Sequence, residues 1–121
     1  MAKLFAVDLD GTLTIGPCWT KEQCLTAPAR EDIIYLINEL YKQGHIILIW
    51  TARREYLRIE TEYWLKKHCV LYHAIDMGHK PGCDAYIDDR AINSLDYFNV
   101  VKGLERTKSL SDKVPEVNKD E

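Results

Sequence analysis

Three short apolar segments, each ending abruptly in polar residues, constrain the fold of this chain more than any other feature. Each segment is followed at once by an acidic or hydroxyl residue: residues 4–7 by Asp8, residues 46–50 by Thr51, and residues 85–87 by Asp88. Continuous apolar runs of this length, separated by helical patterns, are typical of parallel strands buried on both faces. The sequence therefore predicts an α/β fold, with a weaker fourth strand over residues 72–77.

The segments between these strands carry helical patterns. The first has apolar residues at helical spacing, namely Ile33, Leu36, Ile37, Leu40 and Tyr41, with Gly44 placed to end the helix. A second helix is expected from about residue 54 to residue 68. Its inward face stays open between two stripes, one containing Tyr56, Ile59, Tyr63 and Trp64 and the other Leu57 and Leu65. A short helix is expected near residues 92–98.

Alternating strands and helices predict a doubly wound, Rossmann-like parallel sheet with helices on both faces. The 121 residues have room for one domain, expected over residues 1–106, and the polar segment 107–121 reads as a flexible tail. A net charge of -3 argues against a broad basic surface for nucleic acid or anionic membrane. The lack of an apolar run long enough to span a membrane favours a cytoplasmic protein.

The four cysteines, Cys18, Cys24, Cys69 and Cys83, form no C-x-x-C pair, so free thiols are expected rather than a disulfide framework. A zinc site that combines some of them with histidines is a less favoured alternative, because no ligands fall at metal spacing.

The carboxyl ends of parallel strands meet at one edge of a sheet, where the polar residues should gather. Asp8 and Asp10 lie two residues apart, so their carboxylates repel each other unless a positive charge lies between them. Oxygen ligands of this kind suit Mg²⁺, and Asp88 or Asp89 could complete its coordination. Gly11 permits a turn whose backbone N–H groups face an anion.

The segment Asp8-Leu9-Asp10-Gly11-Thr12 resembles the first motif, D-x-D-G-T, of the haloacid dehalogenase-like (HAD) phosphohydrolase superfamily. The other motifs follow in order: Thr51 is similar to the hydroxyl residue of the second motif, Lys80 to the lysine of the third, and the pair Asp88-Asp89 to the acidic fourth motif. The resemblance extends to about residue 98.

The resemblance implies a phosphatase that works through an aspartyl-phosphate. Asp8 would be the nucleophile and Asp10 the general acid and base, with Mg²⁺ held by Asp8, the Asp10 backbone, Asp88 and either directly or indirectly by Asp89. Thr51 and Lys80 would bind the phosphoryl group, together with backbone around Gly11 and Ala52. His79 is an alternative to Lys80, because the loop around these residues leaves the registration open by one residue.

Several roles stay open. Either Arg53 or Arg54 could contact a substrate anion, or pair with a carboxylate. The chain has no room for a cap domain, so an open site is expected, with residues 13–27 as a flap. Trp19 in that flap could contact substrate or pack inside the protein.

The leading hypothesis is a Mg²⁺-dependent phosphomonoester phosphatase acting on a small phosphorylated substrate, such as a sugar phosphate of a polysaccharide or nucleotide-sugar pathway. An open site would suit a large substrate, or a small one enclosed by a second copy of the chain. The alternatives are a 3'-phosphatase on nucleic-acid ends, less favoured by the acidic charge, and a receiver-like phospho-aspartate switch. A receiver would place its adjacent acids after the first strand, which is the opposite order to the one found here.

Overall fold

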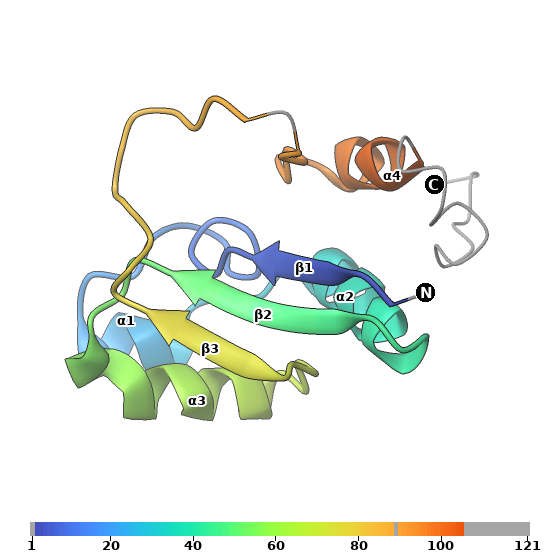
Figure 1. The fold of residues 1–121 in the computed structure, drawn as a ribbon. Coiled ribbons are helices and arrows are strands. Elements are labelled where there is room, and N and C mark those ends of the chain that lie inside the picture. The colour runs from blue at the N-terminus through green and yellow to red at the C-terminus, as the bar shows by residue number, and fades with distance from the viewer. Residues whose placement is uncertain (1, 89, 106–121) are drawn as a thin grey trace.

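The chain forms a parallel sheet of three strands with helices packed against it (Figure 1). The computed structural model describes residues 2–88 and 90–105. The strands are β1 (Leu4–Val7), β2 (Ile46–Thr51) and β3 (Ala74–Met77), in the order β1-β2-β3. The helices are α1 (Lys21–Thr26), α2 (Glu31–Lys42), the 3-10 turn η1 (Glu55–Leu57), α3 (Arg58–Lys67) and α4 (Tyr97–Glu105). The predicted small α/β fold with a parallel sheet is therefore confirmed.

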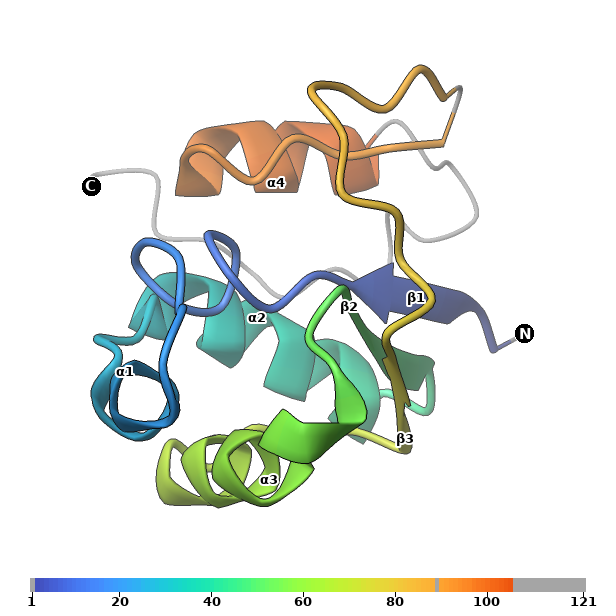
Figure 2. The same cartoon turned by 90° about the vertical axis from the view of Figure 1, so that its left-hand side faces the viewer.

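Helices α1, α2 and α3 lie on one side of the sheet, and α4 lies beyond the β1 edge (Figure 2). The sheet order is the same as the chain order, so the connection from β1 to β2 and the connection from β2 to β3 step across the sheet in the same direction. Since crossovers of this kind are right-handed, both helices must pack on the same face. The prediction of helices on both faces is not met by residues 2–88 and 90–105, and Leu4 and Ile46 on the other face are 61% and 42% exposed.

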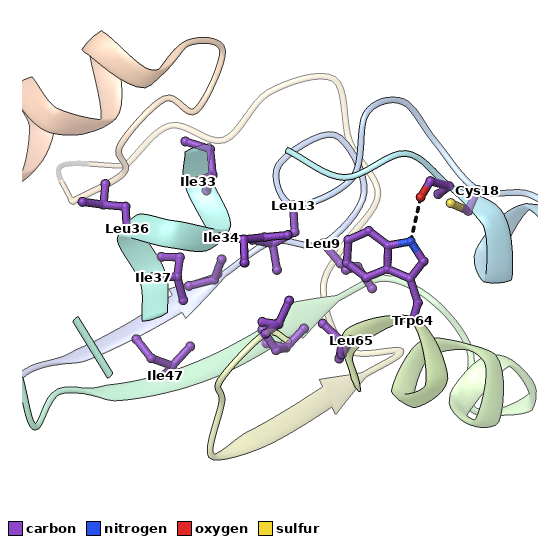
Figure 3. Packing of buried hydrophobic residues seen from close by; sticks show 14 of the residues in the cluster. Leu9, Leu13, Cys18, Ile33, Ile34, Leu36, Ile37, Ile47, Trp64 and Leu65 are labelled. Atoms are coloured by element: carbon purple, nitrogen blue, oxygen red, sulfur yellow. Dashed lines mark hydrogen bonds between the residues drawn. The ribbon is translucent and has the colours of Figure 1, made fainter. Parts of the chain in front are cut away.

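The main core lies between the sheet and these helices (Figure 3). Side chains alternate along β2, so that Ile47 and Ile49 are completely buried while Ile46 faces outward. Trp64 of α3 is also completely buried, and its indole N–H donates to the Ala27 carbonyl at 2.8 Å (Figure 3). This bond joins α3 to the segment that follows α1.

Helix α2 confirms the prediction from apolar spacing. Its buried residues are Ile33, Ile34, Leu36, Ile37 and Leu40. Gly44, with φ of +94°, follows the helix at its carboxyl end, and its N–H donates to the Tyr41 carbonyl at 3.0 Å. For α3 the structure decides the open question: Leu57, Thr61, Trp64 and Leu65 face inward, and Tyr56, Ile59 and Tyr63 are exposed.

The prediction of a strand over residues 85–87 is wrong. These residues belong to a loop that crosses the carboxyl edge of the sheet from β3 towards α4 (Figures 1 and 2). The side chain of Ile87 is fully exposed. A run of only three apolar residues between polar neighbours buries too little surface to fix a strand. Local contacts form instead, such as the Cys83 thiol donating to the Ala85 carbonyl at 3.3 Å.

Residues 13–27, predicted as a flap, are partly built into the core, while Ile15 and Trp19 in the same segment are exposed. Leu13, Thr14 and Cys24 are completely buried, and α1 packs against α3. The Thr20 side chain accepts from the Gln23 backbone N–H at 3.1 Å, while the Gln23 side chain accepts from the Thr20 N–H at 3.2 Å, forming a capping box.

The predicted helix near residues 92–98 lies later in the chain, as α4. The segment 107–121, predicted to be a polar tail, lies outside the described residues. The four cysteines are free thiols, as expected. None of the helices in the described ranges is long and apolar enough to cross a membrane.

Candidate active site

A tight turn at the carboxyl end of β1 carries the two aspartates of the first motif. The Leu9 carbonyl accepts from the backbone N–H groups of Thr12, Leu13 and Thr14, at 3.2, 2.9 and 3.0 Å. Leu9 itself is completely buried, which anchors the turn between two polar neighbours. The side chains of Asp8 and Asp10 are 34% and 26% exposed, so both carboxylates are within reach of a solute.

Gly11 is required in this turn by its backbone conformation. Its φ is +83°, in the left-handed region that side chains disfavour, although a Cβ built there would meet no atom within 4 Å. Its N–H donates to the Thr14 hydroxyl at 3.1 Å, and that hydroxyl donates to the Gly16 carbonyl at 2.8 Å. The buried Thr14 therefore holds the far side of the turn.

Lys80 lies in the loop after β3 and contacts Asp8, which follows β1 at the opposite edge of the sheet. Its Nζ lies 2.8 Å from Asp8 Oδ1, and the lysine side chain is only 9% exposed. Gly78, with φ of +82°, turns the chain after β3 and donates its N–H to the Thr51 carbonyl at 3.1 Å. His79, the alternative, points elsewhere: its side chain is 80% exposed and its Nδ1 lies 2.5 Å from Asp76 Oδ1. The structure thus places Lys80 rather than His79 beside Asp8.

Asp8 also accepts hydrogen bonds from its own turn. Its Oδ1 accepts from the Leu9 N–H at 2.8 Å, and its Oδ2 lies 3.4 Å from the Thr12 hydroxyl. The Thr12 hydroxyl lies 3.0 Å from the Ser94 hydroxyl, so the segment before α4 returns to the rim of the site. These contacts fix the orientation of the Asp8 carboxylate.

Arg53 holds the second aspartate with a two-point ion pair. Its Nε donates to Asp10 Oδ2 at 3.0 Å and its Nη2 donates to Asp10 Oδ1 at 2.7 Å. Its Nη1 donates to the Thr61 hydroxyl at 2.9 Å, which orients the guanidinium from α3. The Arg53 side chain is 3% exposed and each of its three nitrogens is engaged, so it serves Asp10 rather than facing a solute. The structure therefore favours the carboxylate-pairing alternative for this arginine.

The environment keeps Arg53 charged. Burial alone would lower the pKa of Arg53, but the hydrogen bonds and negative charge of Asp10 outweigh burial and raise it above its ordinary value. Asp10 consequently faces a full positive charge at every working pH. A two-point guanidinium–carboxylate pair also fixes the plane of the carboxylate.

The segment that begins with Thr51, at the end of β2, positions the backbone of Arg53 for this ion pair. Thr51 is buried, and its hydroxyl accepts from the Arg53 backbone N–H at 3.1 Å. Ala52 and Arg54 are exposed on either side of Arg53. Thr51 thus lies at the carboxyl edge of the sheet, as predicted. There its hydroxyl contacts the backbone N–H of Arg53.

The structure does not bring Asp88 to the other predicted metal ligands. Asp88 is exposed, and its Oδ1 accepts from the Arg90 N–H at 2.8 Å within its own loop. Asp89 lies outside the described residues. Within residues 2–88 and 90–105, no group of three or more His, Cys, Asp or Glu side chains could hold a metal ion. Asp8 and Asp10 face Lys80 and Arg53, whose positive charges offset the repulsion between the two carboxylates. The predicted Mg²⁺ site also involves Asp89 and stays a prediction.

Sequence reasoning missed three neighbours of the site. Thr61 had no signal beyond its helical position, and Trp50 and Tyr86, which flank Lys80, were read only as strand residues. Trp19, whose role was left open, is 78% exposed, so packing inside the protein is not its role.

A buried thiol lies next to the ion pair. The Cys18 side chain is 8% exposed, and its Sγ donates to the Gln23 carbonyl at 3.7 Å. Burial, followed by the negative charge of nearby Asp10, raises the pKa of Cys18 to about 12. This thiol is therefore neutral at working pH and adds no charge beside Asp10.

Searches against protein-family models and curated protein sequences found no match. Two solved structures share the fold: a Pnkp1/Rnl/Hen1 complex, with 21% identity and a TM-score of 0.54, and the Pnkp1/Rnl/Hen1 RNA repair complex, with 21% identity and a TM-score of 0.55. Each match covers 74% of this chain and 30% or 28% of the other.

A crystal structure of an MCSG target from Vibrio cholerae is more similar, with 31% identity and a TM-score of 0.69. The match covers 93% of this chain and 98% of the Vibrio cholerae chain. At this identity over nearly the full length of both proteins, the chain belongs to the same family as the Vibrio cholerae protein.

Proposed function

We propose that the chain is a phosphomonoester phosphatase of the HAD type, with Asp8 as its nucleophile. The observation that carries the proposal is the contact between Lys80 Nζ and Asp8 Oδ1 at 2.8 Å. It joins residues that are far apart in the sequence at the carboxyl edge of a parallel sheet, where α/β proteins bind their ligands. A partly exposed carboxylate next to a nearly buried ammonium is suited to receive a phosphoryl group.

The proposed first step transfers the phosphoryl group to Asp8. A carboxylate oxygen of Asp8 attacks phosphorus, a phosphoaspartate forms, and the bond to the leaving oxygen breaks. Lys80 offsets part of the negative charge that the nucleophile and the phosphoryl group bring together. Asp10 supplies a proton to the leaving oxygen in this scheme, as the resemblance implies.

The proposed second step hydrolyses the phosphoaspartate. Water attacks phosphorus, the bond to the Asp8 oxygen breaks, and inorganic phosphate leaves while a proton passes to Asp10. Both oxygens of Asp10 accept hydrogen bonds from Arg53. This arrangement fixes the plane of the Asp10 side chain, which favours its role in proton transfer in both steps.

Dependence on Mg²⁺ stays a prediction of the sequence. Nucleophile and substrate together carry more negative charge than the single ammonium of Lys80 can balance, which favours a requirement for a further cation. Thr51, the backbone around Gly11 and Ala52, and the acids Asp88 and Asp89 keep their predicted roles in phosphate and metal binding as part of this proposal.

A small sugar phosphate or related metabolite remains the favoured substrate class, and 3'-phosphorylated nucleic-acid ends remain the alternative. The shared fold with proteins of an RNA repair complex makes 3'-phosphorylated oligonucleotides a necessary part of any substrate panel. The net charge of -3 favours the smaller substrates.

Hydrolysis of an aryl phosphate tests the proposal. We expect Asp8→Asn to lower turnover by at least about a thousandfold, because an amide is a far weaker nucleophile than a carboxylate. A chelator is expected to abolish turnover by the wild type, and added Mg²⁺ to restore it. Asp84→Asn, an exposed aspartate in the loop after β3, is the matched control and should stay active. Full activity of Asp8→Asn would overturn the assignment.

A further inference from the structure

Two aromatic rings flank the ammonium group of Lys80. Its Nζ lies 5.0 Å from the centroid of the Trp50 ring and 5.1 Å from that of the Tyr86 ring. The two rings are 6.2 Å apart at an interplanar angle of 49°. One ring comes from the end of β2 and the other from the loop after β3, so the pair is formed only in the folded chain.

The position of Trp50 is not explained by the core. Residues alternate along β2, and the side chains that pack under the helices are those of Ile47, Ile49 and Thr51. Trp50 belongs to the opposite face, where Ile46 is 42% exposed. A large aromatic side chain on this open face is accounted for by its contact with Lys80 rather than by packing between the layers.

The Tyr86 ring is held in place by its own loop. Its hydroxyl donates to the Pro81 carbonyl at 2.5 Å, and Pro81 is the residue that follows Lys80. The loop thereby closes on itself and lays the ring beside the lysine. Tyr86 is 48% exposed, so it covers Lys80 from the solvent side.

A lysine side chain has many rotamers, and fixing one of them costs conformational entropy. Aromatic faces attract an ammonium group within about 6 Å. Unlike a second carboxylate, they do not compete with Asp8 for the N–H donors of the Lys80 ammonium group. Two rings on two sides, with Asp8 at 2.8 Å on a third, restrict Lys80 Nζ to a small region.

We propose that Trp50 and Tyr86 are positioning residues that form an aromatic clamp and hold the Lys80 ammonium at Asp8. The clamp itself is a feature of the folded chain. Its effect on turnover rests on the proposed function, in which Lys80 neutralises the phosphoryl group.

Nuclear magnetic resonance of ¹³C-lysine-labelled protein tests the clamp without any activity. Protons near the face of an aromatic ring shift upfield, so the Lys80 Hε signals, assigned by their loss in Lys80→Arg, should lie upfield of the other lysines. Trp50→Leu and Tyr86→Leu should each move them back towards the common position. Trp50→Phe, which keeps a ring on β2, should retain most of the shift. Tyr56→Leu removes an exposed ring of η1 and is the control.

Kinetics with an aryl phosphate test the effect on turnover. We expect Trp50→Leu and Tyr86→Leu each to lower kcat by about threefold to tenfold, with a smaller change in KM, and Trp50→Phe to recover most of the loss at its position. A Trp50→Phe variant as impaired as Trp50→Leu would overturn the positioning role. If Trp50→Leu does not fold, the more exposed Tyr86 decides the question.

The two kinds of measurement separate the two proposals. Lys80 signals at the common lysine position in the wild type would overturn the clamp, whatever the activity. A wild type that hydrolyses no phosphomonoester but shows the ring-dependent shifts would support the clamp and overturn the proposed function.

Discussion

Each aspartate of the first motif has its own cation, and the two pairs differ in kind. Asp8 meets a lysine, a point charge at the end of a flexible chain, whereas Asp10 meets the planar fork of Arg53. The lysine ammonium has no fixed plane, so it can offset negative charge on the carboxylate and on an incoming phosphoryl group alike. The arginine fixes the plane of its partner. This difference matches the proposed roles of Asp8 as nucleophile and of Asp10 as the group that transfers protons.

Replacing Arg53 tests the second pair. Arg53→Met leaves Asp10 and Thr61 without their partner, and we expect a loss of roughly 2–3 kcal/mol of unfolding free energy, at the low end for a buried pair because Asp10 is partly exposed. Urea unfolding measures it. Arg58→Met breaks an exposed arginine–glutamate pair and should leave stability nearly unchanged. Equal losses in the two variants would contradict the assigned role of Arg53.

The buried thiol of Cys18 predicts a pH dependence of stability. Its pKa is raised from 9.0 to about 12 in the folded protein, so the folded state holds this proton more tightly than the unfolded chain does. The resulting stabilisation is complete below the unfolded pKa and is lost as the pH rises from there towards the folded pKa.

We therefore compare the wild type with Cys18→Ala at pH values above 9.0, the pKa of the unfolded thiol. In this range the unfolding free energy should decline less steeply with rising pH in Cys18→Ala than in the wild type. Urea unfolding at a series of alkaline pH values measures the slopes. Cys69→Ala, which removes an exposed thiol, should keep the slope of the wild type. A wild-type slope in Cys18→Ala would show that this thiol is not held protonated by the fold.

At the scale of elements, the inward face of a helix could be predicted only where its apolar residues lie on one face of the helix. Helix α2 was predicted with its inward face because its apolar residues lie on a single stripe. The buried face of α3 could not be predicted, since apolar residues surround it, and only packing against α1 and Ala27 selects Trp64 and Leu65. The order of the motifs predicted that Lys80 and Asp8 belong to one site, whereas the pairing of Arg53 with a carboxylate was only one of two alternatives.

Helix α4 is seated on the preceding segment through a glycine. A Cβ on Gly103 would lie 2.5 Å from Ile92 Cγ2 and 3.1 Å from Ile92 Cβ, closer than a β-branched side chain can relieve by rotation. We expect Gly103→Ala to loosen α4 and to lower stability by about 1–3 kcal/mol, measured by urea unfolding. Gly82→Ala, where a Cβ meets no atom within 4 Å, is the control. An unchanged stability in Gly103→Ala would contradict this packing.

At the scale of the molecule, the sheet of the described residues has three strands, one fewer than predicted, because residues 85–87 form no strand. The order β1-β2-β3 places both crossover helices on one face, and the expected strand over residues 85–87 is a loop. The loop that holds residues 85–87 passes the carboxyl edge of the sheet (Figure 2). It contributes Tyr86 beside Lys80. The pattern of three apolar residues indicated a strand. It could not predict that the segment is exposed and forms local hydrogen bonds instead.

Asp8 is proposed to take up a phosphoryl group, and this group can be trapped on the protein. Enzyme mixed with radiolabelled aryl phosphate is quenched in acid and digested, and the labelled peptide is sequenced by mass spectrometry. We predict label on residue 8 in the wild type and more of it in Asp10→Asn, in which hydrolysis of the phosphoaspartate is slowed. Steady turnover with no label on residue 8 in either protein would contradict the account.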